Sequence, residues 1–363
     1  VDMYGALPVG LEADAAAYSS QENVYKLLIA NLDTAATLLK PNLETTLNEE
    51  FDKVYAGQLG KWYKLANSLK LRLAIRMRYA DPAAAKKAGE EAVAAGVITN
   101  NEDNCAVTYV PNGQYKTSVE WGDSRACADL ECFLTGYSDP RLSAYFKPAK
   151  QFTTRTIIGC LAGAKIENKT IADKLYSEAK VDKNTRGVWL TAAEMAFCRA
   201  EGALAGWSGM GGTVEDLYNR AISLSFEQWG LGSASSYLSN NTYTQANYTD
   251  ADGGYGQNVA AVSSITIKWD DTATDEKKLE RLITQKWIAL FPDGQEAWSE
   301  IRRTGYPKVF PVAQSTSGYN LDVPNRIPFA NDELTKNPVN YRKAVQLIGG
   351  TDDYATKMWW QKK

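Results

Sequence analysis

Apolar residues recur at helical spacing in several separate stretches of the chain. In the first stretch they follow one another at intervals of three or four from Val24 to Leu39, after the capping box Ser19–Glu22 and before Pro41. The same pattern predicts further helices over residues of about 61–78, 82–95, 123–135, 191–206, 213–226, 279–290 and 295–303. The chain is therefore predicted to be mainly helical.

Some of these helices are spaced like the hairpins of tetratricopeptide repeats (TPRs). Over residues 191–227, capping boxes at Thr191 and Thr213 open two helices whose small residues would face each other. The stretch from about residue 20 to 97 has a similar pattern. Both stretches are predicted to form TPR-like hairpins.

Long stretches without a clean period separate the hairpins. Residues of about 100–190 are predicted to be rich in loops, with short strands between about 145 and 186. Residues of about 231–271 form a polar insertion rich in Ser, Asn, Thr, Gly and Tyr, and a loop of this length is usually functional. The tail after residue 307 is broken by prolines. Because no linker divides the chain, we expect one helical domain over residues 1–363.

Tyrosine and tryptophan are unusually frequent, with 20 Tyr and 10 Trp against 9 Phe. Both side chains combine an apolar face with a polar group, which suits half-exposed surfaces such as carbohydrate sites. Most of them are expected to pack in the helical core. The loop aromatics, which lie outside the apolar stripes, are Tyr109, Tyr115, Trp121, Tyr176, Trp189, Tyr243, Tyr248 and Tyr255.

Charge and composition exclude several function classes. With 40 Lys and Arg against 43 Asp and Glu, the net charge of −3 gives no basic footprint for nucleic acid. The chain has no histidine, so a Ser-His-Asp triad, a Cys-His pair and a His-ligated zinc site are excluded. Five cysteines without a CxxC pattern favour neither a disulfide framework nor a metal site. No apolar run reaches the length of a membrane span.

The acidic residues do not indicate catalysis. Glu194 and Glu201 lie on one helical face, as a glycosidase pair could, but they stand near Arg199 in an alanine-rich stripe. That arrangement more often ties helices together. Asp270, Asp271 and Asp275 are interpreted as a solvated helix start rather than a cation site. We therefore expect no catalytic residues, no metal and no cofactor.

Short motifs that recur together in one protein family are spread along the chain. They are Trp62, Ala66–Arg72, Gly136–Tyr137, Asp139–Leu142, Ala192–Glu194, Arg199–Glu201, Leu279–Phe291, Glu296–Trp298, Arg302–Pro307, Arg326–Pro328 and Trp359–Trp360. With these motifs the chain resembles the SusD/RagB family of Bacteroidetes outer-membrane nutrient-binding lipoproteins, and the resemblance covers essentially the whole chain.

The resemblance implies an all-α fold in which TPR-like hairpins form a scaffold and long irregular loops form a binding face. It implies a non-catalytic subunit, lipid-anchored on the extracellular face of the outer membrane, that passes oligosaccharides to a SusC-like TonB-dependent transporter. One branch of the family binds peptides instead, so a RagB-like peptide-binding subunit is the alternative. Because the chain begins without the family's lipoprotein signal, we expect it to lack the family's N-terminal segment.

Ligand residues are not carried over by the resemblance, because its motifs belong to the scaffold. Trp298, Arg302 and Arg303 are expected to stabilise the fold through their planar side chains. From the loop aromatics, we predict a stacking platform centred on one tryptophan with nearby polar partners. The predicted ligand-binding residues are Trp121, Tyr115, Asp123, Arg125, Tyr176, Tyr243 and Tyr255.

Two further functions are weighed against glycan capture. A helical-barrel glycosidase would need evenly spaced hairpins around a central carboxylate pair, and both the uneven spacing and the insertion at about residues 231–271 disfavour it. An intracellular TPR scaffold would not need so many aromatic residues in its loops.

Overall fold

The computed structural model describes residues 1–9, 17–152, 155–251, 254, 257–315, 318–319 and 321–363. Within these residues the chain is mainly helical, and the strands form two short antiparallel pairs. The predicted all-α fold class is confirmed.

The elements follow one another along the chain with long irregular connections. The helices are α1 (Gln21–Leu39), α2 (Leu59–Met77), α3 (Pro82–Ala95), α4 (Ala128–Gly136), α5 (Arg141–Tyr145), α6 (Lys169–Leu175), α7 (Ala192–Leu204), α8 (Val214–Gln228), α9 (Ser235–Leu238), α10 (Asp275–Ala289), α11 (Gly294–Thr304), α12 (Asn331–Lys336) and α13 (Pro338–Leu347). The short helical turns are η1 (Lys40–Asn42), η2 (Glu49–Phe51), η3 (Asn101–Asp103) and the π-helical η4 (Tyr115–Glu120). The strands are β1 (Leu7–Pro8), β2 (Tyr18–Ser19), β3 (Cys105–Val107) and β4 (Gly187–Leu190).

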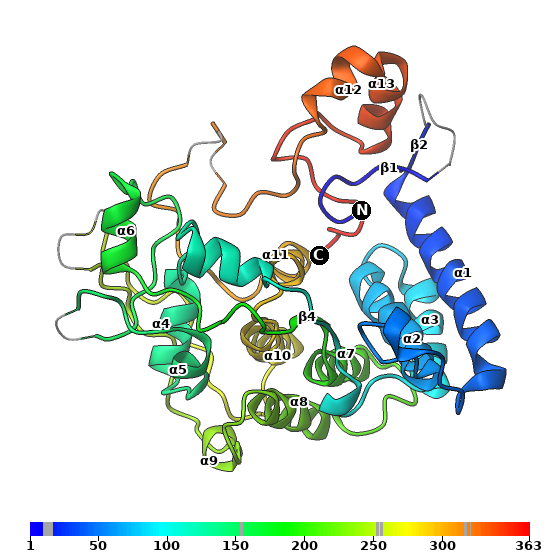
Figure 1. Cartoon of the computed structure of the whole chain (residues 1–363), viewed down its shortest axis with the longest axis horizontal. Coiled ribbons are helices and arrows are strands. Elements are labelled where there is room, and N and C mark those ends of the chain that lie inside the picture. The colour runs from blue at the N-terminus through cyan, green and yellow to red at the C-terminus, as the bar shows by residue number, and fades with distance from the viewer. Residues whose placement is uncertain (10–16, 153–154, 252–253, 255–256, 316–317, 320) are drawn as a thin grey trace.

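The helices form three neighbouring groups (Figure 1). Helices α1–α3 lie on one side, α7, α8, α10 and α11 occupy the centre, and α4–α6 lie on the other side. The hairpins α2–α3 and α7–α8 each pack as antiparallel neighbours, and both α2 and α10 pack against α7. Helix α7 is therefore central to the fold, and the hairpin packing agrees with the predicted TPR-like scaffold.

Local sequence signals place the helix ends. The Thr191 hydroxyl accepts a hydrogen bond from the Glu194 N–H at the start of α7, and Thr213 and Asp216 form a reciprocal capping box at the start of α8. Asp81 caps α3 in the same way. At the end of α11, Gly305 adopts the left-handed conformation that a side chain would disfavour. These ends agree with the predicted ones to within a few residues.

The ring of Trp207 joins α3 to α7 by lying directly on two glycines. A Cβ atom at Gly89 in α3 would stand 2.2 Å from the Trp207 ring, and one at Gly202 in α7 would stand 2.9 Å from it. Neither position can hold a larger residue without moving the indole. Glycine at these two sites lets the helices approach the ring at contact distance.

A buried ionic network holds the central helices together. Arg72 of α2 pairs with Glu194 of α7 at 2.5 Å, and Arg303 of α11 pairs with Glu201 of α7 at 2.5 Å. Arg78, the residue directly after α2, also reaches Glu201, at 3.0 Å. The two glutamates are thus bound to arginines of neighbouring helices, which confirms that they tie helices together.

The predicted structural role of the α11 side chains is also confirmed. The Arg302 guanidinium lies 3.4 Å from the centre of the Trp298 ring. It also donates hydrogen bonds to the carbonyl groups of Asp2 and Asn325. Arg303 is fully buried and bonds Glu201 as well as Glu300.

Three regions differ from the predicted elements. The helix expected from residue 123 begins at Ala128, because the Ala126 N–H donates to the Ser177 carbonyl and the Ala126 carbonyl accepts from the Cys160 N–H. The loop-rich region contains α6, whose first turn is capped by Asn168. The proline-broken tail contains α12 and α13, and Pro338 begins α13 at a position where its missing N–H costs nothing.

The two ends of the chain meet beside α11. The Asp2 carboxylate accepts hydrogen bonds from the Tyr25 hydroxyl at 2.7 Å and from the Trp360 indole at 2.9 Å. The Met3 carbonyl accepts another from the Ile327 N–H. Figure 1 shows both termini at the centre of the molecule.

Candidate functional site

The core of the predicted platform lies on and beside η4. Trp121 follows this π-helical turn and is half exposed, with the Lys116 ammonium 5.6 Å from its ring centre. Tyr115 begins the turn and is partly buried. Asp123 is exposed and pairs with Lys169 at 2.7 Å. Trp121 and Asp123 are thus both accessible to a ligand.

Arg125 is occupied by the protein itself. Its side chain is 6% exposed, and its guanidinium donates to the carbonyls of Ser118, Ser124 and Ala172 and to the Asp173 carboxylate. Four of the five N–H groups of the guanidinium are used in this way. Arg125 therefore fixes the loop after η4 rather than offering its donors to a ligand.

The remaining predicted residues do not gather around Trp121. Tyr176 is 1% exposed, packs among apolar side chains and donates its hydroxyl to Asp250, so neither ring face is open to a sugar. Tyr243 is exposed, but it lies near the opposite end of α4 from η4. The next residue, Thr244, packs on Gly136 at the C-terminal end of α4, whereas η4 precedes the N-terminal end of that helix. Tyr255 lies outside the described residues.

Two other loop aromatics share one exposed face of the β3–β4 pair. In this pair, Val107 of β3 is opposite Gly187 of β4. Because side chains alternate along a strand, Gly187 and Trp189 lie on the same face of β4. The Tyr109 ring lies over Gly187, where a Cβ atom would stand 2.7 Å from it. Tyr109 is 43% exposed and Trp189 is 56% exposed. The structure therefore places these two rings on the same face of β4, although they are 80 residues apart in sequence.

A hollow of about 350 Å³ opens between η4, the start of α4 and the start of α11. We call it the aromatic hollow, because three rings contribute to its wall. Its lining residues are Gln114, Ser118, Ser124, Arg125, Ala126, Cys127, Leu130, Phe146, Ala179, Trp287, Phe291, Pro292, Asp293, Gly294 and Ala297.

Short contacts connect the aromatic hollow to the exposed rings. The Arg72 guanidinium donates to the Trp189 carbonyl at 2.9 Å, and the same nitrogen lies 4.0 Å from the Asp293 carboxylate in the hollow. On the other side, a Cβ atom at Gly113 would lie 3.4 Å from the Tyr109 hydroxyl. Because Gly113 precedes Gln114 of the hollow wall, Tyr109 and the main chain of Trp189 both lie close to the hollow.

Few polar groups reach this surface without a protein partner. The Asp293 carboxylate accepts the Glu296 N–H through Oδ1 at 3.0 Å, and burial raises its pKa. The side-chain amide of Gln114 and the hydroxyl of Ser124 make no hydrogen bond within the described part of the chain. The surface can therefore stack on a ring and form a small number of directed hydrogen bonds.

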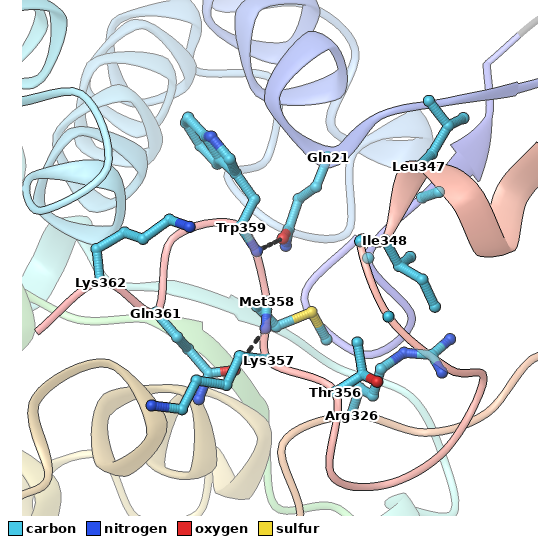
Figure 2. Close-up of a pocket in the computed structure, with 14 residues that line it drawn as sticks. Gln21, Arg326, Leu347, Ile348, Thr356, Lys357, Met358, Trp359, Gln361 and Lys362 are labelled. Carbon is cyan, nitrogen blue, oxygen red and sulfur yellow. Dashed lines mark hydrogen bonds between the residues drawn. The ribbon is translucent and has the colours of Figure 1, made fainter.

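A second hollow, of about 430 Å³, lies between the start of the chain and its tail (Figure 2). Its wall is tied in place by the Trp359 N–H, which donates to Gln21, and by the Met358 N–H, which donates to Gln361. The Trp359 indole points away from Ile348 and packs on the Tyr25 ring at 5.6 Å. This hollow offers no exposed ring for stacking, so the aromatic hollow is the better candidate site.

Among the described residues, no three Cys, Asp or Glu side chains gather in a way that could hold a metal ion. No helix in this part of the chain is long and apolar enough to cross a membrane. The five cysteines are all free thiols.

Comparison with known proteins decides the family. The family model for SusD-like proteins, described as Susd and RagB outer membrane lipoprotein, matches residues 1–361. The chain belongs to the SusD-like family. A comparison with curated protein sequences found no match.

Solved structures of SusD homologues are similar over almost the whole chain. A chitin-binding SusD homologue from Flavobacterium johnsoniae is 39% identical with a TM-score of 0.93, covering 99% of this chain and 77% of the other. A SusD-like protein from Bacteroides thetaiotaomicron is 37% identical with a TM-score of 0.94, covering 100% and 78%. A SusD homologue from Bacteroides uniformis is 37% identical with a TM-score of 0.92, covering 100% and 78%.

Proposed function

We propose that this protein is a non-catalytic glycan-binding subunit of a nutrient-uptake complex, and that it binds glycan at Tyr109, Trp189 and the aromatic hollow. The observation that carries the proposal is the pair of exposed rings on one face beside the hollow. Membership of the SusD-like family supports it, as does the 39% identity to a homologue described as chitin-binding.

Stacking accounts for the attraction to sugar. The C–H faces of a pyranose ring are apolar, so they can lie on the exposed faces of Tyr109 and Trp189. Favourable ring stacking contributes about 0.5–1.5 kcal/mol for each aromatic partner beyond the burial of area. Two adjacent rings can engage successive sugar units, and Trp121 on the outside of η4 would extend the surface to longer chains.

The family description supports a location at the outer membrane, where we propose that the protein is lipid-anchored on the extracellular face. We also propose that its partner is a SusC-like TonB-dependent transporter that receives the bound oligosaccharide. The glycan would be captured at the aromatic surface and released to the transporter unchanged.

The residues of the site support binding without hydrolysis. Among the described lining residues, Asp293 is the single carboxylate of the aromatic hollow, whereas glycoside hydrolysis generally needs two carboxyl groups across the scissile bond. Glu194 and Glu201, the pair weighed from the sequence, are buried in ion pairs with arginine.

The test is affinity electrophoresis with a panel of plant, host and microbial glycans, chitin oligosaccharides included, followed by calorimetry with the retarding glycan. Trp189→Ala and Tyr109→Ala are each expected to weaken binding about tenfold without lowering the melting temperature. Tyr243→Ala is a matched control, because Tyr243 is 44% exposed but lies away from the hollow, and it is expected to bind normally. Trp121→Ala is expected to weaken binding of long oligosaccharides more than short ones.

Other results would overturn this proposal. Normal glycan affinity in both Trp189→Ala and Tyr109→Ala would place the site elsewhere. Binding of peptides, with no retardation by any glycan, would support the RagB-like alternative. Release of reducing sugar by the purified protein would contradict the non-catalytic function.

A further inference from the structure

We propose that the aromatic hollow recognises the acylamino substituent of an amino sugar, such as an N-acetyl group. This inference rests on the proposed function, and it names the class of sugar that the site prefers. On this view the exposed rings hold the sugar faces, while the hollow selects the substituent.

The wall of the hollow is apolar and held firmly. It includes Leu130, Phe146, Trp287 and Phe291. The Phe291 ring is fixed by a stacked contact with the Tyr145 ring, with ring centres 4.4 Å apart, and by the Phe146 ring, with ring centres 5.2 Å apart. A sugar hydroxyl placed against these side chains would lose its water without gaining a partner. A methyl group there gains from leaving water. The wall therefore favours an acyl methyl over a free hydroxyl.

The polar groups of the hollow match the amide of such a substituent. The Asp293 carboxylate uses Oδ1 to accept the Glu296 N–H, and Oδ2 lies 4.0 Å from Arg72, so the carboxylate retains capacity to accept the amide N–H of a ligand. The Gln114 amide and the Ser124 hydroxyl make no hydrogen bond within the described residues, and each can donate to the ligand carbonyl. Donor and acceptor of the acylamino group thus both have candidate partners.

The hollow also has room for the group. Its volume of about 350 Å³ is far larger than the ~30 Å³ that one water molecule occupies in the liquid. At Gly294, on its edge, an added Cβ atom would meet no atom within 4 Å. A substituent and part of its sugar ring can therefore enter without displacing protein atoms.

Two tetrasaccharides that differ at carbon 2 test the inference. Tetra-N-acetylchitotetraose and cellotetraose have the same length and β-1,4 linkage, but one carries acetamido groups where the other carries hydroxyls. We expect calorimetry to give an affinity at least tenfold higher for the acetylated chain, since small apolar groups in a fitted pocket discriminate by about this factor. The de-acetylated chitosan tetramer is expected to bind no better than cellotetraose.

A variant that fills the hollow identifies the responsible site. Gly294→Phe places a ring at the open edge, and it is expected to reduce the affinity for the acetylated tetramer about tenfold, so that the preference over cellotetraose is lost. Gln295→Phe adds the same ring to the same turn of α11, at an exposed residue that does not line the hollow, and is expected to bind as the wild type does. Melting temperatures of both variants show that they are folded.

The outcomes separate this inference from the proposed function. If both tetramers bind equally, or if folded Gly294→Phe keeps the preference, the inference is wrong. In that case loss of both ligands in Trp189→Ala would leave the proposed function intact. If no glycan of the panel or of this set binds at millimolar concentration, the proposed function fails together with the inference.

Discussion

Asp129 is a buried carboxyl group that forms no ion pair within the described residues. Its pKa is raised to about 6, mainly by burial and to a smaller extent by the nearby Asp322, against the opposing effect of the hydrogen bond that Oδ1 accepts from the Phe310 N–H. Between its ordinary value of 3.8 and about 6, the folded protein holds a proton that the unfolded chain has lost. Stability from this residue is therefore full below about pH 4 and falls as the pH rises through 6.

Asp129→Asn removes this penalty and keeps an oxygen for the Phe310 N–H. The difference between the two pKa values corresponds to about 3 kcal/mol, so the variant is expected to be more stable than the wild type by about 1–3 kcal/mol at pH 7.5. The gain should shrink toward zero below pH 4. Urea unfolding at several pH values measures it, and a gain that is independent of pH would contradict the assignment.

Burial also explains which candidate site residues the sequence could identify. Trp121 and Asp123 are exposed, because both stand in a polar turn. Tyr176 looks similar in sequence, but it is buried by residues of distant segments. In the sequence Arg125 resembles a free cation, but in the structure its guanidinium donates to four protein acceptors. Local sequence indicates a polar environment, but not which distant backbone covers a side chain.

Among the elements, α7 packs against its neighbours through small side chains, which let the neighbouring helices approach its backbone closely. Its alanines and Gly202 allow α2, α8 and α10 to pack around it, and Trp207 lies on Gly202 and on Gly89 of α3. One indole thus bridges two hairpins. The contact leaves no space for a methyl group at either glycine.

Gly89→Ala tests this contact. A Cβ atom there would stand 2.2 Å from the Trp207 ring, and overpacking of this kind costs about 1–3 kcal/mol, against a gain of about 1 kcal/mol in helix propensity. We expect a net loss of about 1–2 kcal/mol in denaturant unfolding and a changed Trp207 environment in near-ultraviolet circular dichroism. Gly294→Ala is the control, because its Cβ atom meets nothing within 4 Å and should cost little.

The helices with strong apolar periodicity and caps were predictable, whereas the contacts that build the site were not. Helices α2, α3, α7, α8, α10 and α11 lie close to their predicted ranges. Helices α6, α12 and α13 are short and largely solvent-exposed, so they carry no long apolar stripe. The pairing of β3 with β4, which places Tyr109 and Trp189 on one face, joins residues about 80 positions apart. Its strands are three and four residues long, too short for an alternating pattern.

At the scale of the molecule, the meeting of the chain ends is expected to be important for stability but not for binding. Trp360 is fully buried, its indole N–H donates to Asp2, and the Arg302 guanidinium lies 5.0 Å from its ring. Trp360→Ala is expected to cost about 3–5 kcal/mol of unfolding free energy. Trp360→Phe keeps most of the ring and should cost about 1–2 kcal/mol by leaving Asp2 one donor short.

Denaturant titration measures both losses, and calorimetry with the glycan that binds the wild type provides the second readout. The affinity of each folded variant should be unchanged, because Trp360 does not line the aromatic hollow. A parallel loss of affinity and stability would instead show that the site depends on the contact between Trp360 and Asp2.

The hydrogen bonds that Asp2 accepts from Tyr25 and Trp360 also determine how the molecule responds to mechanical force. Because Asp2 bonds Trp360 beside α11, a force that separates residues 1–3 from residues 358–363 loads that contact before any tension reaches the helical hairpins. The helices begin to carry tension only after Asp2 has left Tyr25 and Trp360. Extension between these two segments would therefore begin with the release of Asp2, while the proposed glycan surface on the β3–β4 face remains folded.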